Sequence, residues 1–279
     1  MKHWFSVDDN IAVCQQKSPL DALETRMLLC HVGGLSRVQL ITQSDRQLNA
    51  EQITALNRLV QKRLDGEPLA YLIGEREFYG LSFKVSPAVL IPRPDTELLV
   101  ELALQYTPDQ SSLLDMGTGS GAIAISIAAQ RRDLQVFACD ISTAALEIAK
   151  FNAEKLLKDR TTIAFYQSDW YQQIPPLRFN TIVSNPPYIV KDDEHLSQGD
   201  LRFEPIDALT DHADGLNAYR KIISQAPNYL AKDGWLLMEH GYHQSQDVQT
   251  LLRDRGFSEV QSWQDLAGIW RVTGGRWQA

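Results

Sequence analysis

Residues 184–189, with the sequence SNPPYI, have side chains that could hold a planar amino group. Pro186 and Pro187 each fix a backbone φ angle and have no N–H group, so this loop is stiff and offers acceptors rather than donors. Asn185 supplies a side-chain oxygen, and Tyr188 supplies an aromatic face beside it. A flat group bearing –NH2 would fit, with both hydrogens accepted and its face covered. An Asn-Pro pair is also an ordinary turn signal, so this segment alone leaves both interpretations open.

A glycine-rich turn within residues 113–126 follows the apolar run LLDM and leads into the helical segment AIAIS. Gly117, Gly119 and Gly121 lack a Cβ atom, so the backbone of the turn can approach a ligand closely. In open α/β sheets, ligands bind at such turns, where strands end. The next apolar run ends in Asp140, at the spacing of about 20 residues where a carboxylate accepts hydrogen bonds from ribose hydroxyls. The pattern predicts a nucleotide or nucleoside site.

Two cofactors compete for this site. Gly117, Gly119 and Ala122 satisfy the G-x-G-x-x-A pattern of dinucleotide sites. Asp115, however, lies directly before the turn, where a pyrophosphate would sit, and a carboxylate there repels phosphate but suits an ammonium group. The sequence therefore favours S-adenosyl-L-methionine, which carries an amino group and a sulfonium and leaves as S-adenosyl-L-homocysteine.

Trp170 follows the third predicted strand, in the run QSDWY. There it would stack on adenine, with Asp169 near the adenine amino group; a tryptophan of the hydrophobic core is the alternative. Residues 184–189 end the fourth predicted strand, so they open into the same crevice as the glycine turn. We therefore predict methyl transfer to an amide or exocyclic amine. Asn185 and a proline carbonyl would accept both N–H hydrogens and favour a pyramidal nitrogen, without a metal or a covalent intermediate.

The elements that position these residues fall into parts of different character. Residues 1–73 carry helix signals and predict a small helical bundle. Ser18 is expected to cap one helix, with Asp21 completing a capping box, and Asn49 to cap another, with Gln52 three positions later.

Residues 74–91 alternate in polarity around Gly80 and predict a β-hairpin linker. In residues 92–279, apolar strands alternate with helices, which indicates a parallel sheet covered on both faces. A final pair of strands is expected to turn at Gly268. We expect a doubly wound, seven-stranded α/β domain of the Rossmann-like methyltransferase type. The first five predicted strands are SLLDMG, QVFACD, TIAFYQSD, NTIVSNPP and WLLMEHG.

Composition narrows the choice of function. The 279 residues carry a formal net charge of -8, which argues against a large footprint on duplex DNA. Three cysteines without C-x-x-C spacing predict neither a disulfide framework nor a metal site. The start MKHWFSVDD lacks the apolar core of a signal peptide, and no apolar run nears the ~20 residues that span a bilayer. We expect a cytoplasmic monomer that does not enter the membrane.

Over nearly its whole length, the sequence resembles the peptide chain release factor glutamine methyltransferases of the HemK/PrmC type. The glycine turn and NPPY are shared with amino-methyltransferases generally, including those of adenine, whereas LIPRPDTE and RFEP are far more specific. The resemblance is carried, in family order, by GEPLAYLIGEREFYGLSFKV (66–85), LIPRPDTELLVE (90–101), LLDMGTGSGAIAI (113–125), SNPPYI (184–189), RFEPIDAL (202–209) and DLAGIWR (265–271).

This resemblance implies methylation of the side-chain amide nitrogen of the glutamine in the Gly-Gly-Gln motif of class-1 release factors. It also implies that the N-terminal helical domain, residues 1–73, docks the release factor. The cofactor contacts expected from the motifs are Gly117, Thr118, Gly119, Ser120, Gly121, Asp140, Trp170 and Asn185. The substrate contacts are Asn185, Pro186, Pro187 and Tyr188, of which Asn185, Pro186 and Tyr188 are expected to be catalytic.

Three further features lie near these motifs. Arg93 in the IPRP segment is expected to border the cofactor. Glu204 invites a general-base role, but an amide nitrogen holds its proton too tightly for a carboxylate to remove it before attack, so a late or structural role is expected. Residues 190–200 are polar and long enough to form a mobile lid; a solvated loop is the alternative.

Other functions compete with this one. An adenine-amino methyltransferase acting on DNA or RNA would hold its substrate amino group in the same kind of loop, and it would need a base flipped out of the stack. The acidic charge, the absence of a basic recognition domain and the segment IPRPDTE stand against it. A nicotinamide-dependent oxidoreductase and a non-catalytic binding protein are further alternatives.

Overall fold

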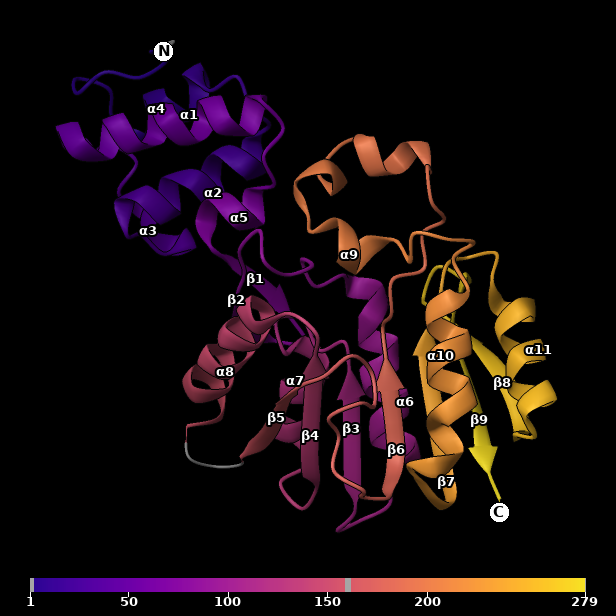
Figure 1. Cartoon of the computed structure of the whole chain (residues 1–279). Helices are drawn as coiled ribbons and strands as arrows, with labels where there is room; N and C mark the ends of the chain where they lie inside the picture. Colours follow the sequence, from indigo (N-terminus) through magenta and orange to yellow (C-terminus); the bar gives the residue numbers. More distant parts are fainter. Residues whose placement is uncertain (1–2, 159–161, 279) are drawn as a thin grey trace. The chain divides into compact units, whose positions relative to one another are not determined.

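The computed structural model describes residues 3–158 and 162–278. It divides the chain after Gly74 into a helical unit and a larger unit that contains both β-sheets (Figure 1). Within the described ranges, no helix is long and apolar enough to cross a membrane.

The helical unit has a hydrophobic core of its own. Leu28, Leu29 and Val60 are completely buried in this core, which also takes in Ile11 and Leu56. The helices are α1 (Ile11–Lys17), α2 (Ala22–Gly33), α3 (Arg37–Thr42), α4 (Ala50–Leu64) and α5 (Leu69–Ile73).

Helix starts in this unit follow side-chain chemistry. The capping box predicted at Asn49 and Gln52 is present, with each side chain accepting a hydrogen bond from the other's backbone N–H. The cap predicted at Ser18 is wrong, because Asp21 caps α2 by accepting from two backbone N–H groups of its first turn. Ser18 instead ends α1 and accepts a 2.6 Å hydrogen bond from the Thr25 hydroxyl. A carboxylate competes better than a hydroxyl for the free N–H groups of a helix start.

A β-hairpin of two short strands, β1 (Glu75–Phe78) and β2 (Leu81–Lys84), opens the larger unit. Its two turn residues, Tyr79 and Gly80, both have positive φ angles (51° and 72°), as a tight hairpin turn requires. Phe78 and Phe83 are buried in the core of the larger unit.

The second sheet has seven strands in the order β5-β4-β3-β6-β7-β9-β8, all parallel except β9, which runs antiparallel to both of its neighbours. This confirms the predicted fold class. β4 and β5 follow β3 outward on one side, while β7, β9 and β8 follow β6 on the other, so the strand order reverses between β3 and β6. Their bounds are β3 (Ser112–Met116), β4 (Gln135–Asp140), β5 (Ile163–Gln167), β6 (Phe179–Ser184), β7 (Leu230–Glu239), β8 (Ser258–Gln264) and β9 (Trp270–Trp277).

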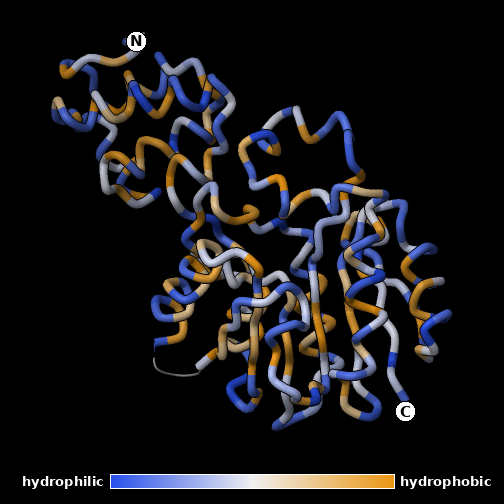
Figure 2. Tube along the Cα trace, viewed as in Figure 1, coloured by the Kyte–Doolittle hydropathy of each residue, from blue (hydrophilic) through white to orange (hydrophobic). Residues whose placement is uncertain are grey.

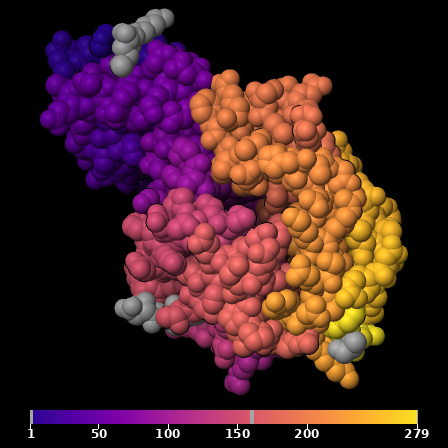
Figure 3. Space-filling view, viewed as in Figure 1, coloured from indigo at the N-terminus to yellow at the C-terminus, as the bar shows by residue number. Residues whose placement is uncertain are grey.

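Helices cover both faces of this sheet. In Figure 1, α6 (Glu97–Tyr106) and α7 (Ala122–Gln130) lie behind the strands and α10 (Asn217–Gln225) lies in front. Neighbouring strand residues point to opposite faces, so Leu113 packs with α6 and α7 while Leu114 packs with α10 and α11 (Ser245–Arg255). Both faces are therefore apolar, and the central strands are orange in Figure 2. In Figure 3, the orange and yellow atoms, which belong to the C-terminal part of the chain, lie together on the right-hand side of the view.

α8 (Thr143–Leu157) contributes to the same core as α7. The remaining elements are short: α9 (Ile206–Leu209) and the 3-10 turns η1 (Pro94–Thr96), η2 (Glu194–Ser197), η3 (Leu201–Phe203) and η4 (Ala226–Asn228).

Candidate active site

The glycine turn joins the end of β3 to the start of α7. Gly117, Gly119 and Gly121 all have positive φ angles (72°, 56° and 82°), which L-residues with a Cβ rarely adopt. A Cβ atom on either of the first two would meet nothing within 4 Å, whereas one on Gly121 would lie 2.7 Å from Ile125 Cδ1. Gly117 and Gly119 thus leave open space for a ligand beside the backbone, while Gly121 allows close helix packing.

Asp140, at the end of β4, organises this turn. One carboxylate oxygen accepts the Gly119 N–H and the other accepts the Ser142 N–H, both at 2.9 Å. Ser142 in turn caps α8, where its hydroxyl oxygen accepts the N–H of Ala145. Burial raises the pKa of Asp140, and these backbone hydrogen bonds oppose the rise. The Asp140 carboxylate lies at the end of β4, the neighbour of β3, and this is the position at which the sequence predicted an acceptor for ribose hydroxyls.

Asp115 lies within β3 and is completely buried. Its Oδ2 accepts the Thr118 hydroxyl at 2.6 Å and the Ala124 N–H at 3.2 Å, but its Oδ1 has no hydrogen-bond partner among the described residues. Burial raises the pKa of this carboxyl to about 7. Ser120, the other polar residue predicted in the turn, is buried, and its carbonyl accepts a hydrogen bond from Asn152.

Trp170 follows β5 with a positive φ angle of 53°. Its carbonyl accepts the Ser168 hydroxyl at 2.7 Å, and its side chain packs in part against the core on the α10 and α11 side of the sheet. The Trp170 ring is half-buried, which agrees with the core packing that was the alternative to a place over the adenine. Ile141, which the sequence did not single out, is 64% exposed directly after Asp140, although it is a large apolar residue.

The SNPPYI loop leaves the sheet at the end of β6, next to the glycine turn. Met116 and Ser184 are register partners at the ends of β3 and β6, and the Ser184 hydroxyl donates to the Met116 carbonyl at 2.8 Å. The loop therefore begins at the point where the strand order reverses, which is the usual ligand site of doubly wound sheets. Pro186 is buried, and the Tyr188 carbonyl accepts a hydrogen bond from the Gln244 side chain.

Asn185 is fixed through the nitrogen end of its amide. Nδ2 donates to the Thr96 hydroxyl at 3.3 Å, and Thr96 is buried at the end of η1. No donor to Oδ1 is found among the described residues. The predicted acceptor is thus left available, as a substrate amide requires.

Glu239, the last residue of β7, is a part of this site that the sequence reasoning missed. It is 2% exposed, and its Oε2 has no partner among the described residues. Burial raises its pKa to about 7, while hydrogen bonding with Thr96 and Asn185 acts in the opposite direction. The sequence feature that could have indicated it is the single carboxylate at the end of the apolar run in LLMEHG. The adjacent His240 is buried, and its Nε2 pairs with the Thr273 hydroxyl at 2.8 Å.

Arg93 and Glu204 form a salt bridge. The Glu204 carboxylate is fully buried and also accepts the Ile91 N–H at 2.9 Å, so it ties the segment before η1 to the segment after η3. These contacts fit the structural role that was one of the two expectations for Glu204.

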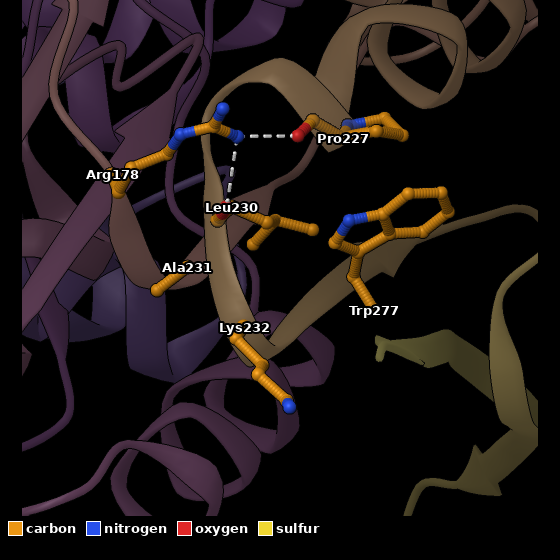
Figure 4. A pocket seen from close by; sticks show the side chains of 6 residues that line it. All are labelled: Arg178, Pro227, Leu230, Ala231, Lys232 and Trp277. Atoms are coloured by element: carbon orange, nitrogen blue, oxygen red, sulfur yellow. Dashed lines mark hydrogen bonds between the residues drawn. The ribbon is translucent and has the colours of Figure 1, made fainter. Parts of the chain in front are cut away.

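A hollow of about 410 Å³ lies away from the glycine turn, at the opposite ends of the strands, where β6 and β7 begin (Figure 4). It adjoins the start of β7, and Arg178 in its wall donates to the carbonyls of Pro227 (2.6 Å) and Leu230 (3.1 Å). The guanidinium thus satisfies backbone carbonyls, and none of the predicted site residues lines this hollow.

Comparisons with known proteins agree with this geometry. Residues 12–74 match the family model described as PrmC N-terminal domain, and residues 94–200 match the one described as Methyltransferase small domain. The release factor glutamine methyltransferase of Burkholderia pseudomallei (strain K96243) is 52% identical over 265 residues, covering 93% of both chains. That of Neisseria gonorrhoeae is 48% identical over 262 residues, covering 93% of this chain and 95% of the other.

Among solved structures, a methyltransferase from Pyrococcus furiosus has a TM-score of 0.55 at 16% identity, covering 78% of this chain and 98% of that chain. At this identity the likeness concerns the fold alone.

Proposed function

We propose that this chain, which belongs to the release factor glutamine methyltransferase family, methylates the glutamine of the Gly-Gly-Gln motif of class-1 peptide chain release factors on its side-chain amide nitrogen. The relatives confirm the family expected from the motifs, and the chain is an S-adenosyl-L-methionine-dependent methyltransferase. The observation that carries the proposal is the anchored Asn185 amide, whose oxygen is left available beside the glycine turn at the point of strand reversal.

The residues around the glycine turn fit S-adenosyl-L-methionine, which supplies a methyl group on a sulfonium when bound. Open space beside Gly117 and Gly119 would admit the amino-acid portion, and the unpartnered Oδ1 of Asp115 is a buried acceptor that suits an ammonium group nearby. Asp140 would accept from the ribose hydroxyls. Trp170 and the exposed Ile141 would cover the adenine.

The other residues of the predicted turn hold its backbone and the start of α7 in place. Thr118 hydrogen-bonds to Asp115, and Gly121 lets α7 start close to the sheet. Ser120 is buried and presents its backbone rather than an open hydroxyl. The product, S-adenosyl-L-homocysteine, would occupy the same place.

The substrate amide would enter on the Asn185 side. Asn185 Oδ1 would accept one N–H hydrogen and the Pro186 carbonyl the other, while Pro187 stiffens the loop and Tyr188 covers the flat face of the amide. Holding both hydrogens favours a pyramidal nitrogen, whose lone pair is partly freed from the carbonyl. Positioning of that nitrogen in line with the donor methyl group would lower the barrier without a covalent intermediate.

Further features complete the proposal. The helical domain, residues 1–73, docks the release factor, and residues 74–91 link it to the methyltransferase domain, residues 92–279. Residues 190–200, which include η2, would close over the crevice as a lid. Arg93, paired with Glu204, would border the cofactor. The chain would act in the cytoplasm as a monomer.

Mass spectrometry of a purified class-1 release factor after reaction with isotope-labelled donor tests the proposal. The expected product carries a single added methyl group on the Gly-Gly-Gln glutamine. A parallel reaction with DNA and RNA checks the adenine alternative. Methylation of nucleic acid, or of another residue of the release factor, would overturn the assignment.

A further inference from the structure

We propose that Glu239 is a positioning residue, which holds the Asn185 amide in the one orientation that can receive the substrate. The inference rests on the proposed function. Ser184 and Met238 are register partners on the parallel strands β6 and β7, so the next residues along, Asn185 and Glu239, lie side by side at the ends of these strands. Thr96 completes the group from η1.

An asparagine amide has two ends of nearly equal size, so rotation by half a turn exchanges its oxygen and its nitrogen. The Thr96 hydroxyl can donate or accept and therefore tolerates either end. An ionised carboxylate only accepts, so it attracts the Nδ2 end of Asn185 and repels the Oδ1 end. Glu239 is thus the group that selects the orientation with Oδ1 turned away from β7.

The burial of Glu239 argues for a functional role over a stabilising one. Its carboxyl group is buried and Oε2 has no partner among the described residues, a state that costs folding free energy. Glu204 offers a contrast, since its equally buried carboxylate is paired with Arg93 and accepts the Ile91 N–H. A neutral side chain of the same shape at position 239 would fold at least as well.

Protonation would undo the selection. A protonated Glu239 carries an O–H group that can donate to Asn185 Oδ1, so it no longer repels the oxygen end of the amide. The charged groups that act on Glu239 are Asp95 on η1, which raises its pKa, and Arg271 on β9, which lowers it. Arg271 is itself shared between Asp95 and Asp265, each at 3.0 Å, so its charge is largely neutralised.

Two polar groups besides Asn185 and Thr96 adjoin this carboxyl. The Tyr219 hydroxyl donates to the Glu239 carbonyl at 2.8 Å, and Tyr188 is electrostatically coupled to the carboxyl. Burial raises the pKa of both tyrosines, so they remain neutral and do not titrate in the same range. Near pH 7, Glu239 is therefore the titrating group next to Asn185.

Glu239→Gln is the decisive variant. We expect kcat at pH 8 to fall about 10- to 100-fold, the range seen when a hydrogen-bonding partner that orients a metal-ligating side chain is removed. KM for S-adenosyl-L-methionine should not change, and the fall of kcat below pH 7 that protonation of Glu239 is expected to cause in the parent should be absent. The free energy of unfolding should be unchanged or higher. Glu204→Gln, the matched control, should lower it by leaving Arg93 without its full partner.

A double-mutant cycle tests whether Glu239 acts through Asn185. In an Asn185→Ala background, Glu239→Gln should have no further effect on kcat, since no amide remains to be oriented. Additive losses, or a parent-like kcat in the single variant, would overturn the inference. So would a drop in stability matching the loss of activity.

A readout that needs no catalysis separates this inference from the proposed function. The side-chain NH2 resonances of Asn185 should shift as the pH passes through about 7 in the parent protein and should not shift in Glu239→Gln. A flat titration in the parent would refute the positioning role even if release factor is methylated. A clear titration in a protein that does not methylate release factor would support the positioning role and reject the substrate.

Discussion

Asp140 accepts the backbone N–H of Gly119 at 2.9 Å, which joins the end of one strand to the middle of the turn that follows its neighbour. The same carboxylate accepts the Ser142 N–H. A residue expected to hold the ribose thus also shapes the backbone on which the rest of the cofactor would lie. Its removal acts on binding in two ways, through the lost contact and through a less ordered turn.

Asp140→Ala should weaken S-adenosyl-L-methionine binding by at least about 1.5–3 kcal/mol, the usual range for hydrogen bonds to a charged group. Isothermal titration calorimetry measures this directly. Asp140→Asn keeps an acceptor for the Gly119 N–H and should lose less. Unchanged affinity in the alanine variant would mean that this carboxylate does not hold the ribose.

Asn185→Ala should lower kcat by about 10²–10³-fold, equivalent to about 2.7–4 kcal/mol, with little change in release-factor affinity. The reason is that the contact tightens as the substrate nitrogen becomes pyramidal. Tyr188→Ala should change both kcat and KM, because the ring holds the amide plane before and during transfer. Steady-state kinetics with purified release factor would distinguish the effects of the two variants on kcat and KM. A parent-like rate for Asn185→Ala would show that Asn185 does not hold the substrate amide during transfer.

Asn185→Asp is a sharper version of this test. It keeps an acceptor, but it places a second carboxylate beside Glu239, and two such neighbours share a proton near neutral pH. We expect partial activity that depends on pH, above that of Asn185→Ala. An aspartate variant no better than alanine would show that the amide nitrogen, and not the acceptor alone, is required.

The helical unit should matter for the protein substrate and not for the cofactor. A chain starting near Gly74 keeps both hydrophobic cores of the larger unit, since the core of the helical unit is separate. It should bind S-adenosyl-L-methionine with parent affinity and methylate intact release factor far more slowly. Circular dichroism and calorimetry check the fold and the binding. Equal rates on whole release factor would exclude a docking role.

Stability should depend on pH through Asp115. Its folded-state pKa of about 7 exceeds the unfolded value of 3.8, so between these pH values the folded state holds a proton that the unfolded state has released. Stability therefore falls as pH rises through this window. Asp115→Asn should remove this part of the fall, a gain on the order of 4 kcal/mol above pH 7 at about 1.36 kcal/mol per pKa unit.

Urea unfolding of the cofactor-free protein at pH 5 and pH 8 measures this effect. The gain should be small at pH 5 and larger at pH 8, and cofactor affinity should fall in the same variant. Equal stability of parent and variant at both pH values would show that the Asp115 carboxyl is not held at a raised pKa.

Local patterns in the sequence were sufficient to predict the strands, the glycine turn and the position of residues 184–189 at the end of the fourth strand of the larger sheet. These features depend on alternation, on glycine and on chain order, all of which a single sequence displays. The cap of α2 was wrong because two capping residues, Ser18 and Asp21, lie three positions apart and both fit a helix start. The partners of Asn185 were missed because Thr96 and Glu239 are far from it in the chain. The pairing of β6 with β7 brings Glu239 beside Asn185, and η1 supplies Thr96.

Asn152 shows how one side chain can stand in for a missing strand. It is completely buried on α8; its Oδ1 accepts the Lys84 N–H at 2.8 Å, and its Nδ2 donates to the Lys84 carbonyl at 3.0 Å and to the Ser120 carbonyl at 2.9 Å. The Asn152 amide thus hydrogen-bonds both the N–H and the carbonyl of Lys84, as a peptide group of an adjacent strand would. Replacing Asn152 by aspartate would remove the two hydrogen bonds that Nδ2 donates, and replacing it by alanine would remove all three side-chain hydrogen bonds. Sequence variation at this position should therefore be close to nil wherever the hairpin and the glycine turn are kept together.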